Sequence, residues 1–321
     1  MENSFMIEVA DLVKDYASYR ALHNLTFNVR RGEIVGLLGR NGAGKSSTMR
    51  ILSCFMPATS GRAKVAGFDV FSQADEVRRR IGYMPESNPL YQEMRVREYL
   101  KFRARLKGLS RAASRSRVDD VIEECSLKEV SRKLIGHCSK GYKQRVGLAD
   151  ALVHEPDLII LDEPTSGLDP NQIRAVRQLI KDLAKKHTVL ISTHILPEVE
   201  MTCSRVLIME QGRILADDTP ENLQSHMNPD GLVRAEIAAP AEALDEWFSD
   251  WAEVKAHDIA VGDGDFFLCS LTPGNGADLR PEVFARCREH GWTLRELTRS
   301  RFSLEDIFMQ VTRTDSREDE H

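Results

Sequence analysis

A glycine-rich run ending in Lys45 and Ser46 carries the clearest chemistry in this sequence. Residues 39–46 read G-x-x-x-x-G-K-S and directly follow the aliphatic run 34–38. Glycines let the backbone pass close to a phosphate with its N–H groups pointing inward, and a helix beginning at Lys45 would add its positive end. Lys45 would reach the β- and γ-phosphates of a nucleoside triphosphate, and the Ser46 hydroxyl would bind Mg²⁺. Because a strand precedes the motif and a helix follows it, we favour this interpretation over a glycine-rich turn without function.

Two adjacent acidic residues, Asp162 and Glu163, end the aliphatic run 158–161. At the end of a buried strand, the Asp162 carboxylate can hold Mg²⁺ directly or through a water. Glu163 could orient or deprotonate the water that attacks the terminal phosphate. Such a pair can also belong to an ordinary exposed loop, but here Pro-Thr-Ser-Gly-Leu-Asp follows at 164–169. Together with the phosphate loop upstream, this segment predicts a nucleoside triphosphatase.

Further motifs narrow this class. The sequence reads Cys-Ser-Lys-Gly-Tyr-Lys-Gln-Arg at 138–145, Asp-Glu-Pro-Thr at 162–165, Ser-Gly-Leu-Asp at 166–169 and Ser-Thr-His at 192–194. With the phosphate loop, and in this order and spacing, they make the chain resemble the ATP-binding subunit of an ABC transporter over roughly residues 5–225. The resemblance implies the α/β fold of a P-loop NTPase of the ABC ATPase type, ATP hydrolysis as the activity, and ATP and Mg²⁺ as ligands.

The resemblance also implies roles for individual residues. Glu163 and His194 would be catalytic, with His194 contacting the γ-phosphate, and Asp169 would communicate between the two sites of a dimer. Tyr16 would stack on adenine, although a core residue at a strand end is the alternative. The loop residues around ATP would be Gly39, Arg40, Asn41, Gly42, Ala43, Gly44, Lys45, Ser46 and Ser47. The signature motif, which would grip ATP bound to the opposite subunit, comprises Ser139, Lys140, Gly141 and Tyr142.

The sequence departs from the family pattern in two places. The signature motif, usually Leu-Ser-Gly-Gly-Gln, reads Cys-Ser-Lys-Gly-Tyr at 138–142, although the phosphate-gripping serine and glycine are kept. The customary glutamine after the run 81–84 is Glu86, which could join Ser46 and Asp162 as a metal ligand and would add negative charge. The signature, with residues 86–91 and 303–308, resembles the ABC-2 exporter group and, within it, the gliding-motility-type ATPases.

The elements expected to position these motifs follow an α/β pattern. Short aliphatic runs alternate with helical stretches over the first two-thirds of the chain, as in proteins with a mainly parallel sheet. Period-two alternation at 7–13 and 25–29 predicts antiparallel strands ahead of this core. Helical spacing over about residues 95–135 predicts a helical insertion.

We expect two domains and a tail. The ABC ATPase domain would span residues 1–225, and a small accessory α+β domain would span 226–313. In the accessory domain, we expect Trp247, Phe248 and Trp251 to belong to the core and not to a ligand cage, and a last helix would begin near Ser303. The charged tail 314–321 is expected to be disordered. His154 and His187, which no motif supports, are expected on the surface.

Composition restricts the class of protein further. The chain has 321 residues, of which 44 are basic and 49 acidic, whereas a dedicated nucleic-acid binder usually has a basic surplus. No run approaches the ~18 apolar residues of a membrane helix. Residues 1–4 have neither a basic start nor an apolar core, so we do not expect a secretory signal there. The six cysteines are far apart, which favours buried thiols in a reducing cytosol. We expect a cytoplasmic protein that a partner holds at the cytoplasmic face of the membrane.

The functional hypothesis is therefore the motor subunit of an exporter, working as a head-to-tail homodimer on a separate membrane-spanning permease. Residues 86–100 would form a groove for a short permease helix, with Leu90, Tyr91, Met94 and Val96 as its apolar surface, or these residues pack locally in the core. A soluble ABC ATPase acting on ribosomes or DNA is the alternative. Such proteins commonly carry two ATPase units or long coiled insertions, and this chain has neither. A role of the accessory domain in regulation or dimerisation stays open.

Overall fold

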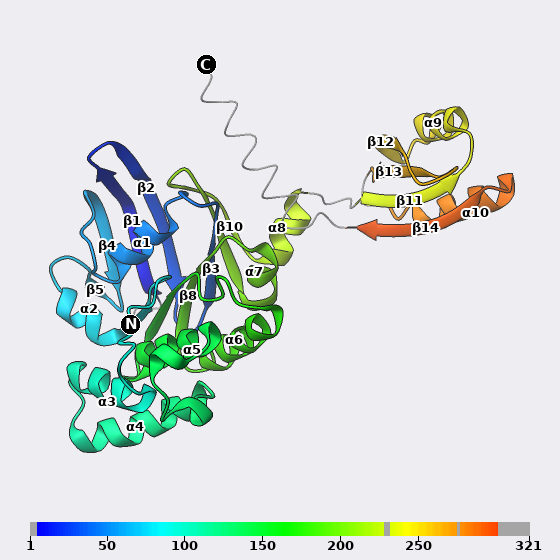
Figure 1. Cartoon of the computed structure of the whole chain (residues 1–321). Helices are drawn as coiled ribbons and strands as arrows, with labels where there is room; N and C mark the ends of the chain where they lie inside the picture. Colours follow the sequence, from blue (N-terminus) through cyan, green and yellow to red (C-terminus); the bar gives the residue numbers. More distant parts are fainter. Residues whose placement is uncertain (1–4, 228–231, 275–276, 301–321) are drawn as a thin grey trace. The chain divides into compact units, whose positions relative to one another are not determined.

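The computed structural model describes residues 5–227, 232–274 and 277–300, and Figure 1 shows its course. The chain divides into two compact units between Thr219 and Pro220. The division thus precedes α8 (Pro220–Met227), whereas the expected boundary between residues 225 and 226 lies inside this helix. The expected helix near Ser303 and the tail 314–321 lie outside the described residues.

The first unit is built around a six-stranded sheet with the order β10-β9-β3-β8-β7-β6. Its strands are β3 (Ile34–Leu38), β6 (Ile81–Met84), β7 (Leu158–Asp162), β8 (Thr188–Thr193), β9 (Arg205–Glu210) and β10 (Arg213–Asp218). All neighbours pair in parallel except the hairpin β9–β10. Every residue of β7 and β8 is buried, as the aliphatic sequences of such strands require. The carboxyl ends of β3, β7 and β8 therefore meet at one edge of the sheet.

A second, antiparallel sheet with the order β2-β1-β4-β5 packs against this one. It contains β1 (Phe5–Tyr16), β2 (Tyr19–Arg30), β4 (Ser60–Val65) and β5 (Phe68–Asp69). One hydrophobic cluster joins β1 and β2 to β3 and to α1 (Lys45–Leu52). Helix α2 (Ala74–Arg80) follows β5. The expectation of antiparallel strands ahead of an α/β core is confirmed.

The helical insertion contains α3 (Val96–Leu106) and α4 (Arg111–Glu124), followed by short 3₁₀ turns at Lys128–Val130 and Ile135–His137. It leads into α5 (Lys140–Leu152). Asp150 on α5 ties α3 of the insertion to α5, because it accepts hydrogen bonds from Tyr99 Oη at 3.1 Å and Arg103 Nε at 2.8 Å. Helices α6 (Pro170–Leu183) and α7 (Leu196–Thr202) complete the unit.

The second unit is an α+β sandwich, the accessory fold expected. An antiparallel sheet of order β12-β13-β11-β14 carries two helices. Its elements are β11 (Leu232–Ala238), α9 (Ala241–Asp250), β12 (Val254–Val261), β13 (Phe267–Pro273), α10 (Arg280–His290) and β14 (Thr293–Ser300). Phe248 is fully buried, whereas Trp247 and Trp251 are only half-buried and stack on each other with ring centroids 5.4 Å apart.

All six cysteines are free thiols, and five of them are buried. Burial raises the pKa of Cys203 to about 12, which keeps this thiol protonated and unreactive. Among the described residues, no helix is both long and apolar enough to cross a membrane.

Candidate active site

The phosphate loop lies between β3 and α1, at the edge where the parallel strands end. Its shape needs glycine: a Cβ on Gly39 would lie 2.3 Å from the carbonyl oxygen of Met209. Gly44, directly before α1, has a φ of +101°, a left-handed conformation that side chains disfavour. The loop therefore leads the backbone into the N-terminus of α1, where free N–H groups favour an anion.

Lys45 is buried and lies over this loop. Its Nζ donates hydrogen bonds to the carbonyl oxygens of Gly39 at 2.8 Å and Arg40 at 3.1 Å. The same ammonium lies 3.6 Å from Glu163 Oε1, and both side chains are less than a tenth exposed. A positive charge held between the loop and a carboxylate at the end of β7 fits the terminal phosphates of a nucleotide.

Asp162 and Ser46 supply hard oxygen ligands beside the loop. Ser46 Oγ donates to Asp162 Oδ1 at 3.2 Å, and Ser192 Oγ donates to the same oxygen at 2.5 Å. A hydroxyl next to a carboxylate is the ligand chemistry of Mg²⁺, which usually takes one or two protein oxygens and completes its shell with phosphate and water. Among the described residues, no group of three or more His, Cys, Asp or Glu side chains is arranged to hold a metal ion.

Glu163 and His194 meet at the ends of the neighbouring strands β7 and β8. Glu163 Oε2 lies 2.9 Å from His194 Nδ1. The backbone of Glu163 has a φ of +49°, unusual for a residue with a side chain, and its N–H donates to Ser192 Oγ at 3.1 Å. Strain of this kind persists where surrounding contacts hold it, and it is common at active sites. The carboxylate is thus fixed between a cation and an imidazole.

Ser192 is a site residue to which the sequence assigned no role. Its hydroxyl donates to the Asp162 carboxylate and accepts from the Glu163 N–H, so one side chain fixes both acidic residues. The pairing of Asp162 with Ser192 in the parallel ladder of β7 and β8 places it there. The sequence signal was its place in the Ser-Thr-His motif, directly before Thr193 and His194.

Lys45, Ser46, Glu163 and His194 line one open cavity of about 390 Å³, whereas Asp162 and Ser192 are not part of its lining. It brings together most of the expected ATP-binding residues with Glu86, Glu163 and His194. Gly39, Arg40 and Ala43 shape the loop without lining the cavity. The lining comprises Tyr19, Ala21, Asn41, Gly42, Gly44, Lys45, Ser46, Ser47, Glu86, Glu163, Ser166 and His194.

The aromatic ring that lines this cavity belongs to Tyr19, while Tyr16 lies beside it. Tyr16 and Tyr19 are cross-strand partners at the β1–β2 turn, and their rings stack with centroids 5.2 Å apart. Tyr16 Oη lies 3.2 Å from Ser47 Oγ, whereas Tyr19 is 60% exposed. Tyr19 is thus the aromatic side chain that is open to the cavity. The sequence analysis assigned it no role, because the two tyrosines lie only three residues apart and the sequence alone does not show which of them faces the cavity.

The signature motif is not part of the cavity. Ser139 caps α5, and its Oγ accepts a hydrogen bond from the Tyr142 N–H at 3.4 Å. Gly141 packs on Gln172 of α6, where a Cβ would come within 2.4 Å of the amide oxygen. Asp169 caps α6 by accepting from the N–H groups of Asn171 and Gln172. Lys140 lies beside Gly167, in the segment that leads to Asp169.

Comparisons with known proteins agree with this geometry. A family model described as "ABC transporter" matches residues 22–166. The chain is 35% identical to the bacitracin transport ATP-binding protein BcrA of Bacillus licheniformis, over 96% of this chain and 97% of that protein. It is 33% identical to the Nod factor export ATP-binding protein I of Burkholderia orbicola, over 95% of this chain and 96% of that protein.

Solved structures resemble the first unit. The structure of an ATP-binding subunit of an ABC transporter superposes with a TM-score of 0.63 and 35% identity, over 69% of this chain and 93% of that one. A dimeric post-hydrolysis state of the cassette MJ0796 bound to ADP and Pi gives 0.61 and 25% identity, over 67% of this chain and 98% of that one. The predicted fold class is thereby confirmed. The chain belongs to the ATP-binding subunits of ABC transporters, and it is an ATPase that drives a membrane transporter.

Proposed function

We propose that this chain is the motor of an ABC-2 type exporter, acting as a head-to-tail homodimer on a separate membrane-spanning permease. The main support for a dimer is that the expected ATP-binding residues form two separate groups in the chain. The cavity holds the phosphate loop, Glu163 and His194, whereas Ser139 and Gly141 lie outside it on α5. Ser139 begins a helix whose free N–H groups can receive a phosphate, so a second copy of the chain supplies what the cavity lacks.

In this proposal the chain's own residues bind, orient and move a proton. The loop N–H groups and the Lys45 ammonium hold the phosphates, and the Ser46 hydroxyl and Asp162 would hold Mg²⁺ with the nucleotide. Bound Mg²⁺ would neutralise charge on the phosphate oxygens. Glu163 orients the attacking water and takes its proton, while His194 fixes the carboxylate. Loss of the γ-phosphate contacts then opens the dimer, because ATP favours only the closed state.

A groove beside the cavity is the proposed docking site of the permease. It has a volume of about 530 Å³ and lies between α1, the segment after β6, α3 and α5. Glu86 lines both this groove and the nucleotide cavity, and Asp162 also lines the groove. A partner seated here would therefore touch the segment that reaches the metal-binding side chains.

The apolar surface of the groove differs from the expected one. Val96 is fully buried and does not line the groove, which favours local core packing for this residue, whereas Leu90 lines the groove although it is only 8% exposed. Among the exposed aromatic side chains, Phe55 (74%) lines the groove, whereas Tyr91 (44%) and Phe102 (37%) lie outside its lining. Tyr91 packs against Phe102 with ring centroids 5.8 Å apart, which makes an aromatic edge suited to a short amphipathic helix.

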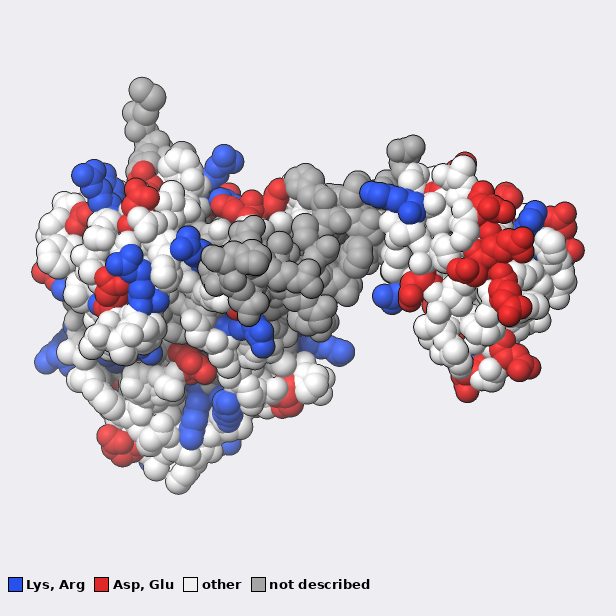
Figure 2. Space-filling view, turned by 90° about the horizontal axis from the view of Figure 1, so that it is seen from above, with Lys and Arg blue, Asp and Glu red and all other residues white. Residues whose placement is uncertain are grey.

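Surface charge gives no support to the nucleic-acid alternative. On the face seen in Figure 2, basic and acidic side chains are interspersed over the first unit, and acidic ones gather on the second. Between residues 232 and 300 the sequence has 13 acidic and 7 basic residues. Neither pattern makes the continuous basic surface that binding to phosphate backbones requires. The names of the relatives described above concern transport or export, not ribosomes or DNA.

Assignment of the chain to the ABC-2 exporter group, and within it to the gliding-motility-type ATPases, stays a prediction from the sequence. Residues 86–90 line the groove, and residues 303–308 lie outside the described part of the chain, so the ABC-2 assignment rests on the sequence resemblance and on the exporter named among the relatives. Membership of the gliding-motility-type ATPases rests on the sequence resemblance alone.

Site-specific crosslinking tests the permease contact. A photoreactive residue at Phe55, which lines the groove and is 74% exposed, should crosslink to a polytopic membrane protein in cells that express the chain from its own chromosomal locus. Phe71 is 78% exposed and lies outside the groove, so the same residue placed there is the matched control. Equal crosslinking from both positions, or crosslinking from Phe55 only to ribosomal proteins, would contradict the proposal.

A further inference from the structure

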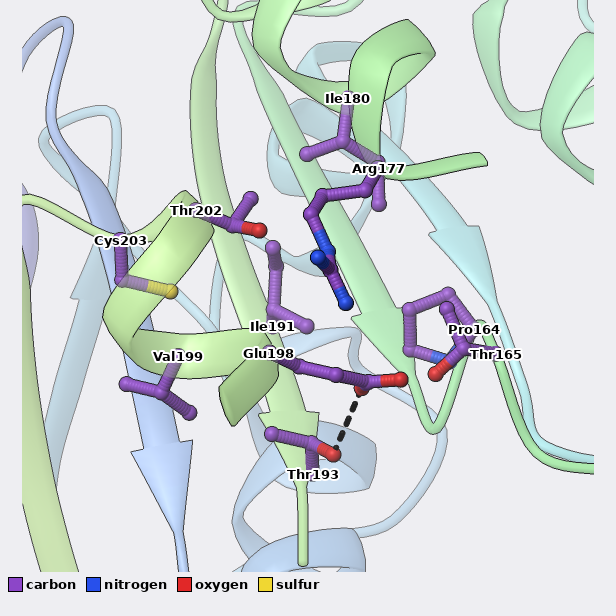
Figure 3. A pocket seen from close by; sticks show the side chains of 10 residues that line it. All are labelled: Pro164, Thr165, Arg177, Ile180, Ile191, Thr193, Glu198, Val199, Thr202 and Cys203. Carbon is purple, nitrogen blue, oxygen red and sulfur yellow. Dashed lines mark hydrogen bonds between the residues drawn. The ribbon is translucent and has the colours of Figure 1, made fainter. Parts of the chain in front are cut away.

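A small cavity lies behind the two loops that carry Glu163 and His194, between α6, α7 and the end of β8 (Figure 3). Its volume is about 10 Å³, close to that of a single water-sized sphere. Three polar side chains, from Thr165, Arg177 and Glu198, point into it, as Figure 3 shows. The remaining wall is largely apolar and includes Ile180, Ile191 and Val199.

Each of these polar side chains has one buried atom without a hydrogen-bond partner in the described part of the protein. The atoms are Thr165 Oγ1, Arg177 Nε and Glu198 Oε1. Thr165 is 4% exposed and Glu198 is 7% exposed, so bulk water does not reach them. Buried polar atoms in native proteins are nearly always satisfied, by protein or by ordered water. Three orphan atoms facing one space therefore point to an occupant of that space.

The charges in this cavity lead to the same conclusion. Glu198 Oε2 accepts a hydrogen bond from Thr193 Oγ1 at 3.0 Å, which is a weak compensation for a buried carboxylate. Arg177 Nη1 donates to the thioether of Met201 at 2.8 Å, a poor acceptor for a guanidinium. Within the described residues, neither charge forms an ion pair. Opposite charges thus face the same space without touching.

We propose that one structural water occupies this cavity and joins all three side chains. It accepts a hydrogen bond from Arg177 Nε–H, donates one to Glu198 Oε1, and makes a third with Thr165 Oγ1. Three hydrogen bonds are the usual number for a buried water. Arg177 and Glu198 then form a pair separated by one water.

The bridge ties together the two loops that meet in the active site. Thr165 follows Glu163 by two residues. Thr193 directly precedes His194. Its Oγ1 donates a hydrogen bond to Glu198 and accepts one from the Ile195 N–H at 3.1 Å, so these contacts fix the backbone before and after His194. The water therefore links the Glu163 loop to the His194 turn, with Arg177 of α6 as the third anchor. Thr165, Arg177 and Glu198 are positioning residues for the contact between Glu163 and His194.

A crystal structure of the full chain, at a resolution that shows single waters, tests the site itself. The expected result is one ordered water within hydrogen-bond distance of Thr165 Oγ1, Arg177 Nε and Glu198 Oε1. A direct ion pair between Arg177 and Glu198 that closes the cavity would overturn the proposal. Density showing no water there would do the same.

Steady-state ATPase kinetics test the positioning role with two near-isosteric variants. Thr165→Val removes the hydroxyl, and Glu198→Gln removes the charge. Each should lower kcat by roughly 10-fold and leave KM for Mg-ATP unchanged within about 2-fold, because misplaced catalytic groups slow the chemical step more than they weaken binding. Thr165→Ser keeps the hydroxyl and should restore kcat.

The controls separate positioning from general stability. Arg174→Met changes an exposed arginine on the same helix and should leave kcat and Tm unchanged. If Thr165→Val lowers Tm but leaves the kcat of the folded protein intact, the side chain is merely structural and the positioning role is wrong. The double variant that combines Thr165→Val with Glu198→Gln should lose little more kcat than either single variant, because both substitutions act on the same water bridge. If the two losses of kcat multiply in the double variant, the proposed positioning role is also wrong.

Discussion

His194 Nδ1 lies 2.9 Å from Glu163 Oε2, and this contact joins the ends of two adjacent parallel strands. The opposite oxygen of the same carboxylate lies 3.6 Å from Lys45 Nζ. Glu163 is thus held from two sides, by residues separated by more than a hundred positions in the chain. Such a fixed carboxylate suits the orientation of an attacking water, since little reorganisation is needed at the moment of reaction.

Replacement of Glu163 tests its role as general base. Glu163→Gln keeps the shape and the contact with His194 but removes the basic oxygen. ATP binding should persist, while kcat should fall on the order of 10²- to 10⁴-fold, the usual contribution of a positioned base. Nucleotide binding by equilibrium dialysis and phosphate release measure the two effects. Full ATPase activity in the variant would remove Glu163 from this role.

Replacement of Lys45 tests the phosphate loop. Lys45→Ala removes a buried ammonium that contacts the loop carbonyls, and a charge-assisted hydrogen bond to phosphate is worth about 1.5–3 kcal/mol. The affinity for ATP should therefore fall on the order of 10- to 100-fold. The matched control is Lys185→Ala, which changes a lysine that is 74% exposed and far along the chain. Equal affinities in both variants would refute the assignment of the loop.

The two tyrosines at the β1–β2 turn differ in what they offer to adenine. Tyr19 lines the cavity, whereas Tyr16 stacks beneath it and reaches Ser47. Because aromatic stacking on a base contributes about 1–3 kcal/mol, Tyr19→Ala should weaken ATP binding by about 10-fold, and Tyr16→Ala should weaken it less. Competition between ATP and a fluorescent nucleotide gives both affinities. If Tyr16→Ala weakens ATP binding more than Tyr19→Ala does, then Tyr16 stacks on adenine, as the sequence resemblance implies.

His154 makes the stability of the first unit depend on pH. Burial and the nearby Lys107 ammonium lower the pKa of His154 from 6.5 to about 4, and a ring nitrogen lies 2.9 Å from the Ile81 carbonyl oxygen. The unfolded chain therefore takes up a proton near pH 6.5 before the folded protein does. This stability is fully present above pH 6.5 and is lost as the pH falls toward 4, by about 3 kcal/mol.

The variant His154→Gln isolates this effect, because an amide can keep a donor on the Ile81 carbonyl without titrating. Thermal unfolding between pH 7 and 4.5 should show a smaller decrease of Tm in the variant than in the natural protein. Parallel decreases in the two proteins would assign the acid sensitivity to carboxylates elsewhere.

Much of the site could be predicted because its parts follow buried strands. The aliphatic runs that became β3, β7 and β8 identify the strands, and parallel pairing brings their carboxyl ends to one edge. Lys45, Glu163 and His194, each assigned a role in advance, meet there. These three residues meet because β3, β8 and β7 are neighbours in the sheet. The family resemblance implies this strand order, whereas the hydrophobic pattern of each strand does not.

What the sequence left out depends on packing across elements. Ser192 acts on Asp162 only because the two residues are register partners, and register is invisible in a single strand. His154 was expected on the surface but is half-buried beneath β6, since its neighbours in sequence gave no sign of the Ile81 carbonyl. Val96 fits a helical period equally well as groove or core, and the structure places it in the core.

The central claim is that two copies of the chain complete each other's nucleotide sites. Light scattering on the Glu163→Gln variant, which we expect to bind ATP without turning it over, measures this most directly. The chain has a mass of 36.2 kDa, and Mg-ATP should double the observed mass while Mg-ADP should not. Adding Ser139→Ala should abolish the doubling, because the second copy then lacks its phosphate-gripping hydroxyl. An unchanged monomer mass in Mg-ATP, or a dimer indifferent to Ser139, would contradict the account.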